Sequence, residues 1–211
     1  MSEKASIFEE TLKHYLDQLT RVDLAAKAEV LGVEIQEGQA VVPLLGNKFR
    51  VSPKGVFDPQ GKSPAHAVQV VLCRYLILAP AFPPPGEDWV SYRDFKDAAP
   101  FVGGFINNTE QALIKRFSSR VSALRTACLK IGGRPSDLEL SYEIVAQFDL
   151  LPRIPLLLLF NDQDEEFPAQ CSVLFKRNAA AFLDMECLAI LGWLLTDTLV
   201  QATGIDHNTI M

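Results

Sequence analysis

The stretch formed by residues 151–169 constrains the fold of this chain more than any other part of the sequence. An uninterrupted run of large apolar residues, 156–160, follows a proline-restricted entry at Ile154-Pro155 and leads directly into four acids within the five positions 162–166. A short apolar run bounded by turn residues is typical of a buried strand. The acids that follow either belong to a site or end the strand in water, and both interpretations are open at this point.

The first third of the chain changes from a helical to a strand period. Apolar residues recur at three- and four-residue steps over residues 7–31, which predicts an amphipathic helix that residues 21–23 divide into two. Over residues 33–51 the apolar residues alternate, with turn signals at Glu37-Gly38 and Gly46-Asn47. We therefore expect two helices followed by an antiparallel meander of about three short strands.

The middle of the chain is predicted to be helical around a proline-rich connection. Pro64 favours a helix over residues 65–78, because proline suits the first helical turn. The prolines at 80–85 exclude regular structure there. Thr109 is expected to cap a helix over residues 110–117, and a further helix over 120–131 should end at Gly132-Gly133.

The last third is predicted to contain three strands and a long helix. Residues 142–148 alternate as a strand, and the runs 156–160 and 172–175 should pair as a hairpin around the acidic turn. Asn178 is expected to cap a final helix over 179–202, which is apolar around most of its circumference. Its thin exposed side should carry three acids, Asp184, Glu186 and Asp197.

These elements together predict an α+β fold, in which helices, including the long apolar C-terminal one, pack on an antiparallel sheet. Residues 1–211 are expected to form a single domain. The alternative is two lobes divided near residues 80–88, where a cleft would most naturally lie.

Charge and cysteine usage exclude several classes of protein. The net charge is −6 and basic residues form no stripe, so we expect no nucleic-acid partner. The longest apolar run spans 187–195, short of the roughly 20 residues that a membrane span needs, and the N-terminus does not resemble a secretory signal. The four cysteines are scattered. We therefore expect buried, reduced thiols in a cytoplasmic protein.

Four blocks of sequence are similar to those of an uncharacterised domain family of comparable length, known as a domain of unknown function in anaerobic bacteria and archaea. The blocks are residues 91–98 (SYRDFKDA), 151–155 (LPRIP), 164–169 (DEEFPA) and 172–175 (SVLF). The resemblance extends over roughly residues 22–199 and implies no particular activity. The resemblance also implies that some members carry an added four-cysteine iron–sulfur module similar to that of corrinoid proteins. The scattered cysteines of this chain do not form such a module, so its cofactor is unknown.

The acidic turn is the first candidate ligand-binding site. Asp164, Glu165 and Glu166 offer oxygen atoms of the kind that Mg²⁺ and Ca²⁺ prefer, although the spacing is not that of an EF-hand loop. The adjacent Phe167-Pro168 suggests that the loop folds back onto the body of the protein. The alternative is a solvated hairpin tip that protects a sheet edge.

Two arginine segments are the other candidates. Arg93, next to Asp94, offers a planar fork for a carboxylate or phosphate, and Arg153 is positioned rigidly between two prolines. Each arginine also has a structural alternative. Arg93 would form an ion pair with Asp94 or with a glutamate of the acidic turn, and Arg153 would form one with the acidic turn.

Other familiar sites are weakly supported or absent. Gly103-Gly104 form a tight turn or, less simply, a phosphate-binding loop. The histidines and cysteines have no zinc-ligand spacing, so no metal site is assigned, and the nucleophile-elbow, dinucleotide and P-loop motifs are missing.

These observations lead to three hypotheses. The first is a small-ligand-binding or accessory protein of anaerobic metabolism, with a small molecule or another protein as its partner. The second is a carboxylate-dependent, metal-assisted enzyme acting on an anionic substrate. The third is a homodimer formed through residues 188–195 with Trp193 as an anchor, although a core position is the simpler expectation for Trp193.

Overall fold

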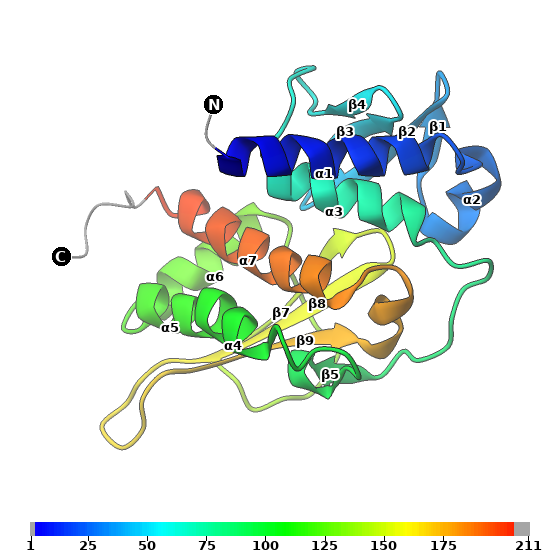
Figure 1. The fold of residues 1–211 in the computed structure, drawn as a ribbon. Helices are drawn as coiled ribbons and strands as arrows, with labels where there is room; N and C mark the ends of the chain where they lie inside the picture. Colours follow the sequence, from blue (N-terminus) through cyan, green and yellow to red (C-terminus); the bar gives the residue numbers. More distant parts are fainter. Residues whose placement is uncertain (1–2, 205–211) are drawn as a thin grey trace.

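The computed structural model describes residues 3–204, with side chains from residue 8 onward, and confirms the α+β class (Figure 1). Two antiparallel sheets form its framework, with strand orders β1-β2-β3-β4 and β5-β9-β8-β7-β6. The first sheet contains β1 (Glu34–Gln36), β2 (Gln39–Leu44), β3 (Asn47–Ser52) and β4 (Gly55–Phe57). The second contains β5 (Trp89–Ser91), β6 (Arg134–Pro135), β7 (Ile144–Leu151), β8 (Ile154–Asn161) and β9 (Gln170–Lys176).

Helices connect and cover these sheets. The α-helices are α1 (Glu3–Leu19), α2 (Leu24–Leu31), α3 (His66–Ile77), α4 (Val102–Phe105), α5 (Gln111–Phe117), α6 (Val121–Lys130) and α7 (Met185–Ala202). The shorter turns are the 3₁₀ segments η1 (Tyr92–Asp94) and η3 (Arg177–Ala181) and the π-helical η2 (Ile106–Glu110). In Figure 1, α1 and α3 lie side by side, and α7 crosses in front of the second sheet.

The N-terminal elements follow the sequence pattern closely. The expected break between the first two helices is confirmed, because the Asp23 side chain accepts a hydrogen bond from the Ala26 N–H (3.0 Å) and so begins α2. Gly32 ends this helix in the left-handed region, with φ at +68°. The meander is confirmed and has one strand more than expected, because β4 pairs with β3.

The hairpin predicted around the acidic turn is also confirmed. Its strands β8 and β9 pair from Leu156↔Phe175 to Asn161↔Gln170. Strand β8 also pairs with β7, so it lies in the middle of the sheet and its apolar residues are buried on both faces. This position explains an unbroken apolar run in which neighbouring side chains do not alternate between core and solvent.

The helix expected over residues 110–117 is confirmed as α5, but the cap and the turn predicted before it are wrong. Gly103 and Gly104 belong to α4 and form no turn or phosphate-binding loop, and Thr109 lies inside a continuous helical segment that runs from α4 through η2 to α5. This segment approaches α7 closely at Gly192, where a Cβ atom would lie 2.6 Å from Phe105 Cε2 and 2.8 Å from Thr109 Oγ1. Thr109 is fully buried at this contact. The packing between helices therefore overrides the local preference of Asn and Thr for helix caps.

The start of the last helix also differs from the prediction. Asn178 lies in η3, and α7 begins after Asp184, which accepts a hydrogen bond from the Cys187 N–H (2.8 Å). Asp184 is half-buried and forms an ion pair with Arg74 of α3 (2.6 Å), so it does not lie on a free surface. Capping and ion pairing together fix the point where α7 meets α3.

The expected long C-terminal helix is present as α7, but it is shorter than the predicted 179–202 and only weakly apolar. By length and composition alone, its 18 residues are enough to cross a membrane. A core helix passes the same test, and α7 buries one face, including Leu188, Leu191 and Leu195. The uninterrupted apolar run 187–195, considered alone from the sequence, is shorter than the apolar segment that α7 forms.

The two sheets share one hydrophobic core. Buried residues from α2, the meander, α3, the second sheet and α7 belong to the same cluster of contacts. Polar contacts reinforce the junction: the Tyr75 hydroxyl donates to the Leu31 carbonyl (2.6 Å), and the Leu45 N–H donates to the Leu150 carbonyl (3.0 Å). The proline-containing segment 78–88 connects α3 to β5.

Glu110 closes an open edge of the second sheet. Strand β5 ends at Ser91, which pairs with Leu174, and one residue further along β9 the Val173 N–H donates to Glu110 Oε1 (3.1 Å). Glu110 is 9% exposed, and burial raises the pKa of its carboxyl, partly offset by the Val173 N–H and the charge of Arg93. The Glu110 side chain thus takes the place of a neighbouring strand beyond the end of β5.

Replacing Glu110 with glutamine should stabilise the protein at neutral pH. The folded protein binds the Glu110 proton more tightly than the unfolded chain, so wild-type stability falls as pH rises from the ordinary glutamate pKa through the raised folded pKa. Glutamine keeps an acceptor for Val173 and removes the buried charge. Urea unfolding between about pH 4 and 8 should show a shallower pH dependence in Glu110→Gln, whereas the exposed control Glu87→Gln should match the wild type. A slope equal to that of the wild type would contradict this assignment.

Candidate functional site

Arg153 holds two parts of the fold together. Its Nε donates to the Val30 carbonyl (2.9 Å) and its Nη2 to the Glu29 carbonyl (2.7 Å), at the C-terminal end of α2. A cation at this end also interacts favourably with the helix dipole. Gly32 makes room for the contact, since a Cβ there would lie 3.0 Å from Pro152 Cβ. The ion pair with the acidic turn, offered as an alternative, is not formed.

Arg93 and Asp94 lie in η1. Asp94 Oδ2 accepts a hydrogen bond from the Ser91 N–H (3.1 Å) as part of a capping box, so this carboxylate helps to fix the turn that follows β5. Arg93 is exposed, and its positive charge offsets part of the rise that burial causes in the pKa of Glu110. No Arg93–Asp94 ion pair occurs in the described part of the chain.

The acidic turn projects into solvent at the end of the β8–β9 hairpin (Figure 1). Asp164 Oδ1 accepts hydrogen bonds from the N–H groups of Glu166 (2.8 Å) and Phe167 (2.7 Å), while Glu165 and Glu166 are exposed. Phe167 is 60% exposed, so the expectation that this loop folds back onto the body is wrong. Within residues 8–204, no group of three or more potential metal ligands comes together, here or elsewhere.

The base of this hairpin is attached to the connection between α5 and α6. Asp162 Oδ1 accepts a hydrogen bond from the Ser119 N–H (2.6 Å), and Gln163 Nε2 donates to Ser119 Oγ (2.8 Å).

The six predicted site residues do not form one site. They lie in three separate places: Arg93 and Asp94 in η1, Arg153 between β7 and β8, and Asp164, Glu165 and Glu166 at the hairpin tip.

A hollow of about 320 Å³ lies where α3, the segment after η1 and the start of α7 meet. We call it the Arg74 hollow. Its apolar wall contains Leu78, Phe95, Leu183 and Met185, and its charged lining residues are Arg74, Lys96, Asp97 and Asp184.

The charges of the Arg74 hollow fall into a paired and an unpaired set. Arg74 directs Nε (2.8 Å) and Nη2 (2.6 Å) to the same oxygen of Asp184, and its guanidinium lies 5.4 Å from the centre of the Tyr15 ring. Burial raises the pKa of Tyr15, which keeps its hydroxyl neutral. Lys96 and Asp97 are exposed and form no hydrogen bond or ion pair with the described residues.

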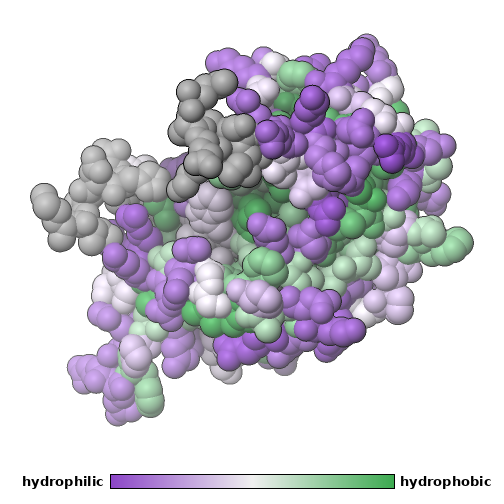
Figure 2. Space-filling model, viewed as in Figure 1, coloured by the Kyte–Doolittle hydropathy of each residue, from purple (hydrophilic) through white to green (hydrophobic). Residues whose placement is uncertain are grey.

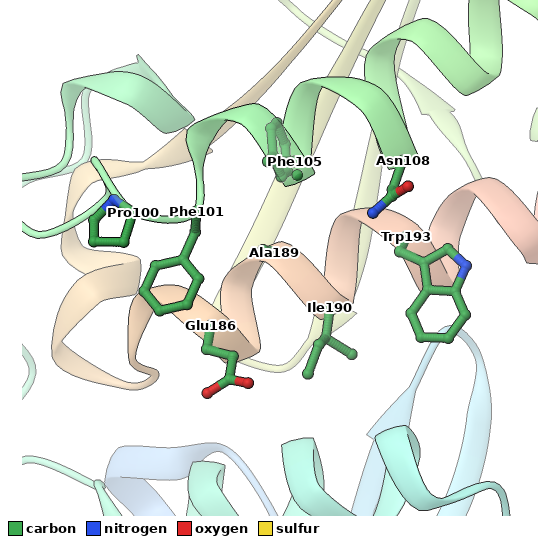
Figure 3. Close-up of a pocket in the computed structure, with 9 residues that line it drawn as sticks. Pro100, Phe101, Phe105, Asn108, Glu186, Ala189, Ile190 and Trp193 are labelled. Carbon is green, nitrogen blue, oxygen red and sulfur yellow. The ribbon is translucent and has the colours of Figure 1, made fainter.

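A second hollow, of about 220 Å³, lies between α4 and α7 (Figure 3). Phe101, Ile190 and Trp193 point toward the same open side of it, and Trp193 is 42% exposed. The expectation that Trp193 belongs to the core is therefore wrong. A neighbouring hollow of about 180 Å³ shares Asn108 and Trp193 with the 220 Å³ hollow and extends to Arg116.

Comparison with known proteins identifies a family for this chain. A family model described as a domain of unknown function, DUF3786, matches residues 23–198. The chain belongs to the DUF3786 family. The comparisons with curated proteins and with solved structures found no match.

The DUF3786 match begins at the N-cap of α2 and ends within α7, so it contains both sheets and nearly all residues that line the hollows. The four cysteines of this DUF3786 protein are free and buried, as expected. Burial raises the pKa of the Cys73 and Cys128 thiols to about 12, which keeps both protonated and unreactive at neutral pH.

Sequence reasoning did not predict the three hollows of this DUF3786 domain, although it named some residues that line them, among them Trp193, Asp184 and Glu186. Arg74 and Asp184 lie 110 positions apart and meet only through the packing of α3 against α7. One signal was present: Arg74 is a single cation inside an otherwise apolar helix, and such a residue usually needs a partner. Trp193 carries no such signal, because a tryptophan in an apolar helix is usually buried.

Proposed function

We propose that this DUF3786 protein is a small-ligand-binding protein and that the Arg74 hollow is its binding site. The observation that carries the proposal is the combination of an apolar wall with unpaired charges at the mouth of one hollow. Binding sites are typically concave and mostly apolar, with a few polar groups that orient the ligand.

The chemistry of the lining favours a small anionic molecule with an apolar body. The ammonium group of Lys96 is available to a carboxylate or phosphate, and Arg74 Nη1 donates to no described residue. Leu183 and Met185 are buried apolar residues beside it. The Arg74–Asp184 pair is already neutral, so Lys96 provides the positive charge for the anionic group of the ligand, and the neighbouring Asp97 offers an acceptor for a hydroxyl or amino group of the same ligand.

The wider setting is part of the same proposal. The free, buried thiols support a cytoplasmic protein, since such thiols persist in a reducing compartment. A role in anaerobic metabolism is supported by the sequence resemblance alone. The enzyme alternative gains no support from the acidic turn, whose carboxylates are exposed at a projecting tip.

Replacing Lys96 with glutamate should remove the bound ligand without unfolding the protein. Lys96 is exposed and unpaired, so the charge reversal disturbs no internal contact. Native mass spectrometry of protein purified without oxygen from its own host should show added mass in the wild type that is lost on denaturation. Occupancy should fall about tenfold or more in Lys96→Glu, because a hydrogen bond to a charged group is replaced by repulsion.

The matched control is Lys54→Glu, which reverses the charge of an exposed lysine in the turn between β3 and β4. This variant should retain the added mass of the wild type. A bare polypeptide mass for the wild type, or full occupancy in Lys96→Glu, would refute the Arg74 hollow as the binding site.

A further inference from the structure

The two hollows that share Asn108 and Trp193 lie end to end along α7, and α4, η2 and α5 border them on the other side. We call this pair of adjoining hollows the α7 groove. Its centre is apolar, with Ile190 half-buried and Trp193 42% exposed. Figure 2 shows hydrophobic residues over this part of the molecule, between more hydrophilic margins. Exposed tryptophan in an apolar groove is characteristic of protein interfaces, where such residues contribute much of the binding energy.

The two ends of the α7 groove carry opposite unpaired charges. Glu186 lines one end and Arg116 the other, and neither forms a hydrogen bond or ion pair within the described part of the chain. Asp197 also lines the Arg116 end, but it is half-buried and already takes part in an interaction within the protein. The groove therefore runs from an acidic end, across Ile190 and Trp193, to a basic end.

We infer that the α7 groove binds a second copy of this chain, related by a two-fold axis that passes near Trp193. A two-fold interface places the same surface on itself in reversed orientation. The apolar centre then covers the apolar centre of the partner, and Glu186 meets Arg116 of the partner subunit, twice. An apolar groove with a single charge sign would not be self-complementary in this way. The α7 groove shares no lining residue with the Arg74 hollow, so this inference is independent of the proposed ligand site.

Charge reversals provide a test that only this arrangement passes. The full-length wild type should sediment as a dimer at micromolar concentration. Glu186→Arg and Arg116→Glu should each raise the dimer dissociation constant about tenfold or more, because each creates two like-charge contacts. An equimolar mixture of the two variants should restore the dimer, because one contact then joins the introduced arginine to the introduced glutamate and the other keeps the native pair. This rescue also shows that both variants are folded.

Removal of the aromatic anchor gives a second, independent readout. Trp193→Ala should raise the dissociation constant about thirtyfold, the effect expected at an interface hot spot. The matched control is Phe167→Ala, since Phe167 is also an exposed aromatic residue but lies on the hairpin tip. A monomeric wild type across the micromolar range would overturn the inference. So would a dimer that the single reversals leave intact, or a mixture that fails to associate.

Discussion

Replacing Tyr92 with alanine is expected to lower the free energy of unfolding by about 3–5 kcal/mol, the range for deleting a buried aromatic ring. Tyr92 is 1% exposed, and its ring stacks on Phe105 with centroids 4.2 Å apart. Phe95 and Phe175 contact the same ring edge-on at 6.3 and 6.5 Å. The loss therefore opens a cavity at the centre of an aromatic cluster, where η1, α4 and β9 meet.

The conservative change Tyr92→Phe separates packing from hydrogen bonding. The Tyr92 hydroxyl donates to the Met185 carbonyl at the start of α7 (2.6 Å). Phenylalanine keeps the ring contacts and removes this hydrogen bond, but the Met185 carbonyl still faces the N–H one turn further along α7, so we expect a cost of only about 0.5–1.5 kcal/mol. Denaturant unfolding measures both variants. If Tyr92→Phe were as costly as Tyr92→Ala, the hydrogen bond rather than the aromatic cluster would dominate at this position.

Replacing Gly192 with alanine is expected to destabilise the protein by about 1–3 kcal/mol, although alanine is the better helix former. The new methyl group would lie 2.6 Å from Phe105 Cε2 and 2.8 Å from Thr109 Oγ1, both of which belong to tightly packed side chains. The helical segment 102–117 would have to move away from α7 to accept it.

The matched control is Gly103→Ala, the same substitution in α4. A Cβ at Gly103 meets no atom within 4 Å. The only expected effect is therefore the higher helix propensity of alanine compared with glycine. We expect a gain of about 0.5–1 kcal/mol. Thermal unfolding of the two variants should therefore shift in opposite directions. A stabilising Gly192→Ala would show that α7 and the 102–117 segment are less closely packed than the structure indicates.

Local patterns in the sequence predicted much of the secondary structure. The run 156–160 and the acids after it define the β8–β9 hairpin, because a buried central strand needs continuous apolar residues and its turn needs polar ones. Asp23 and Gly32 likewise mark the two ends of α2, as its N-cap and its C-cap. The helix over 102–117 could not be predicted in this way, because the residues that favour turns there are held in a helix by contact with Gly192, more than eighty positions away.

The proposed binding surfaces differ from the secondary structure in this respect, because local sequence patterns do not predict them. Sequence reasoning selected charged residues that are conspicuous in the chain, such as Arg153 and Asp164, and the structure employs both to hold turns and helix ends. The Arg74 hollow depends on α3, the segment after η1 and the start of α7 meeting, which no local pattern encodes. The exposed position of Trp193 depends in the same way on how α4 covers only part of α7.

The pairing of β5 with β9 has a consequence for how this chain reaches its native state. Strands β7, β8 and β9 are successive hairpin partners and can form from nearby segments, whereas Trp89 of β5 must find Lys176 after all the intervening residues have been ordered. The entropy lost in closing so long a loop is recovered only when the strand is in place. We therefore expect the β5–β9 edge, with Glu110 sealing its end, to form late in folding, and the edge of β9 to stay unpaired until then.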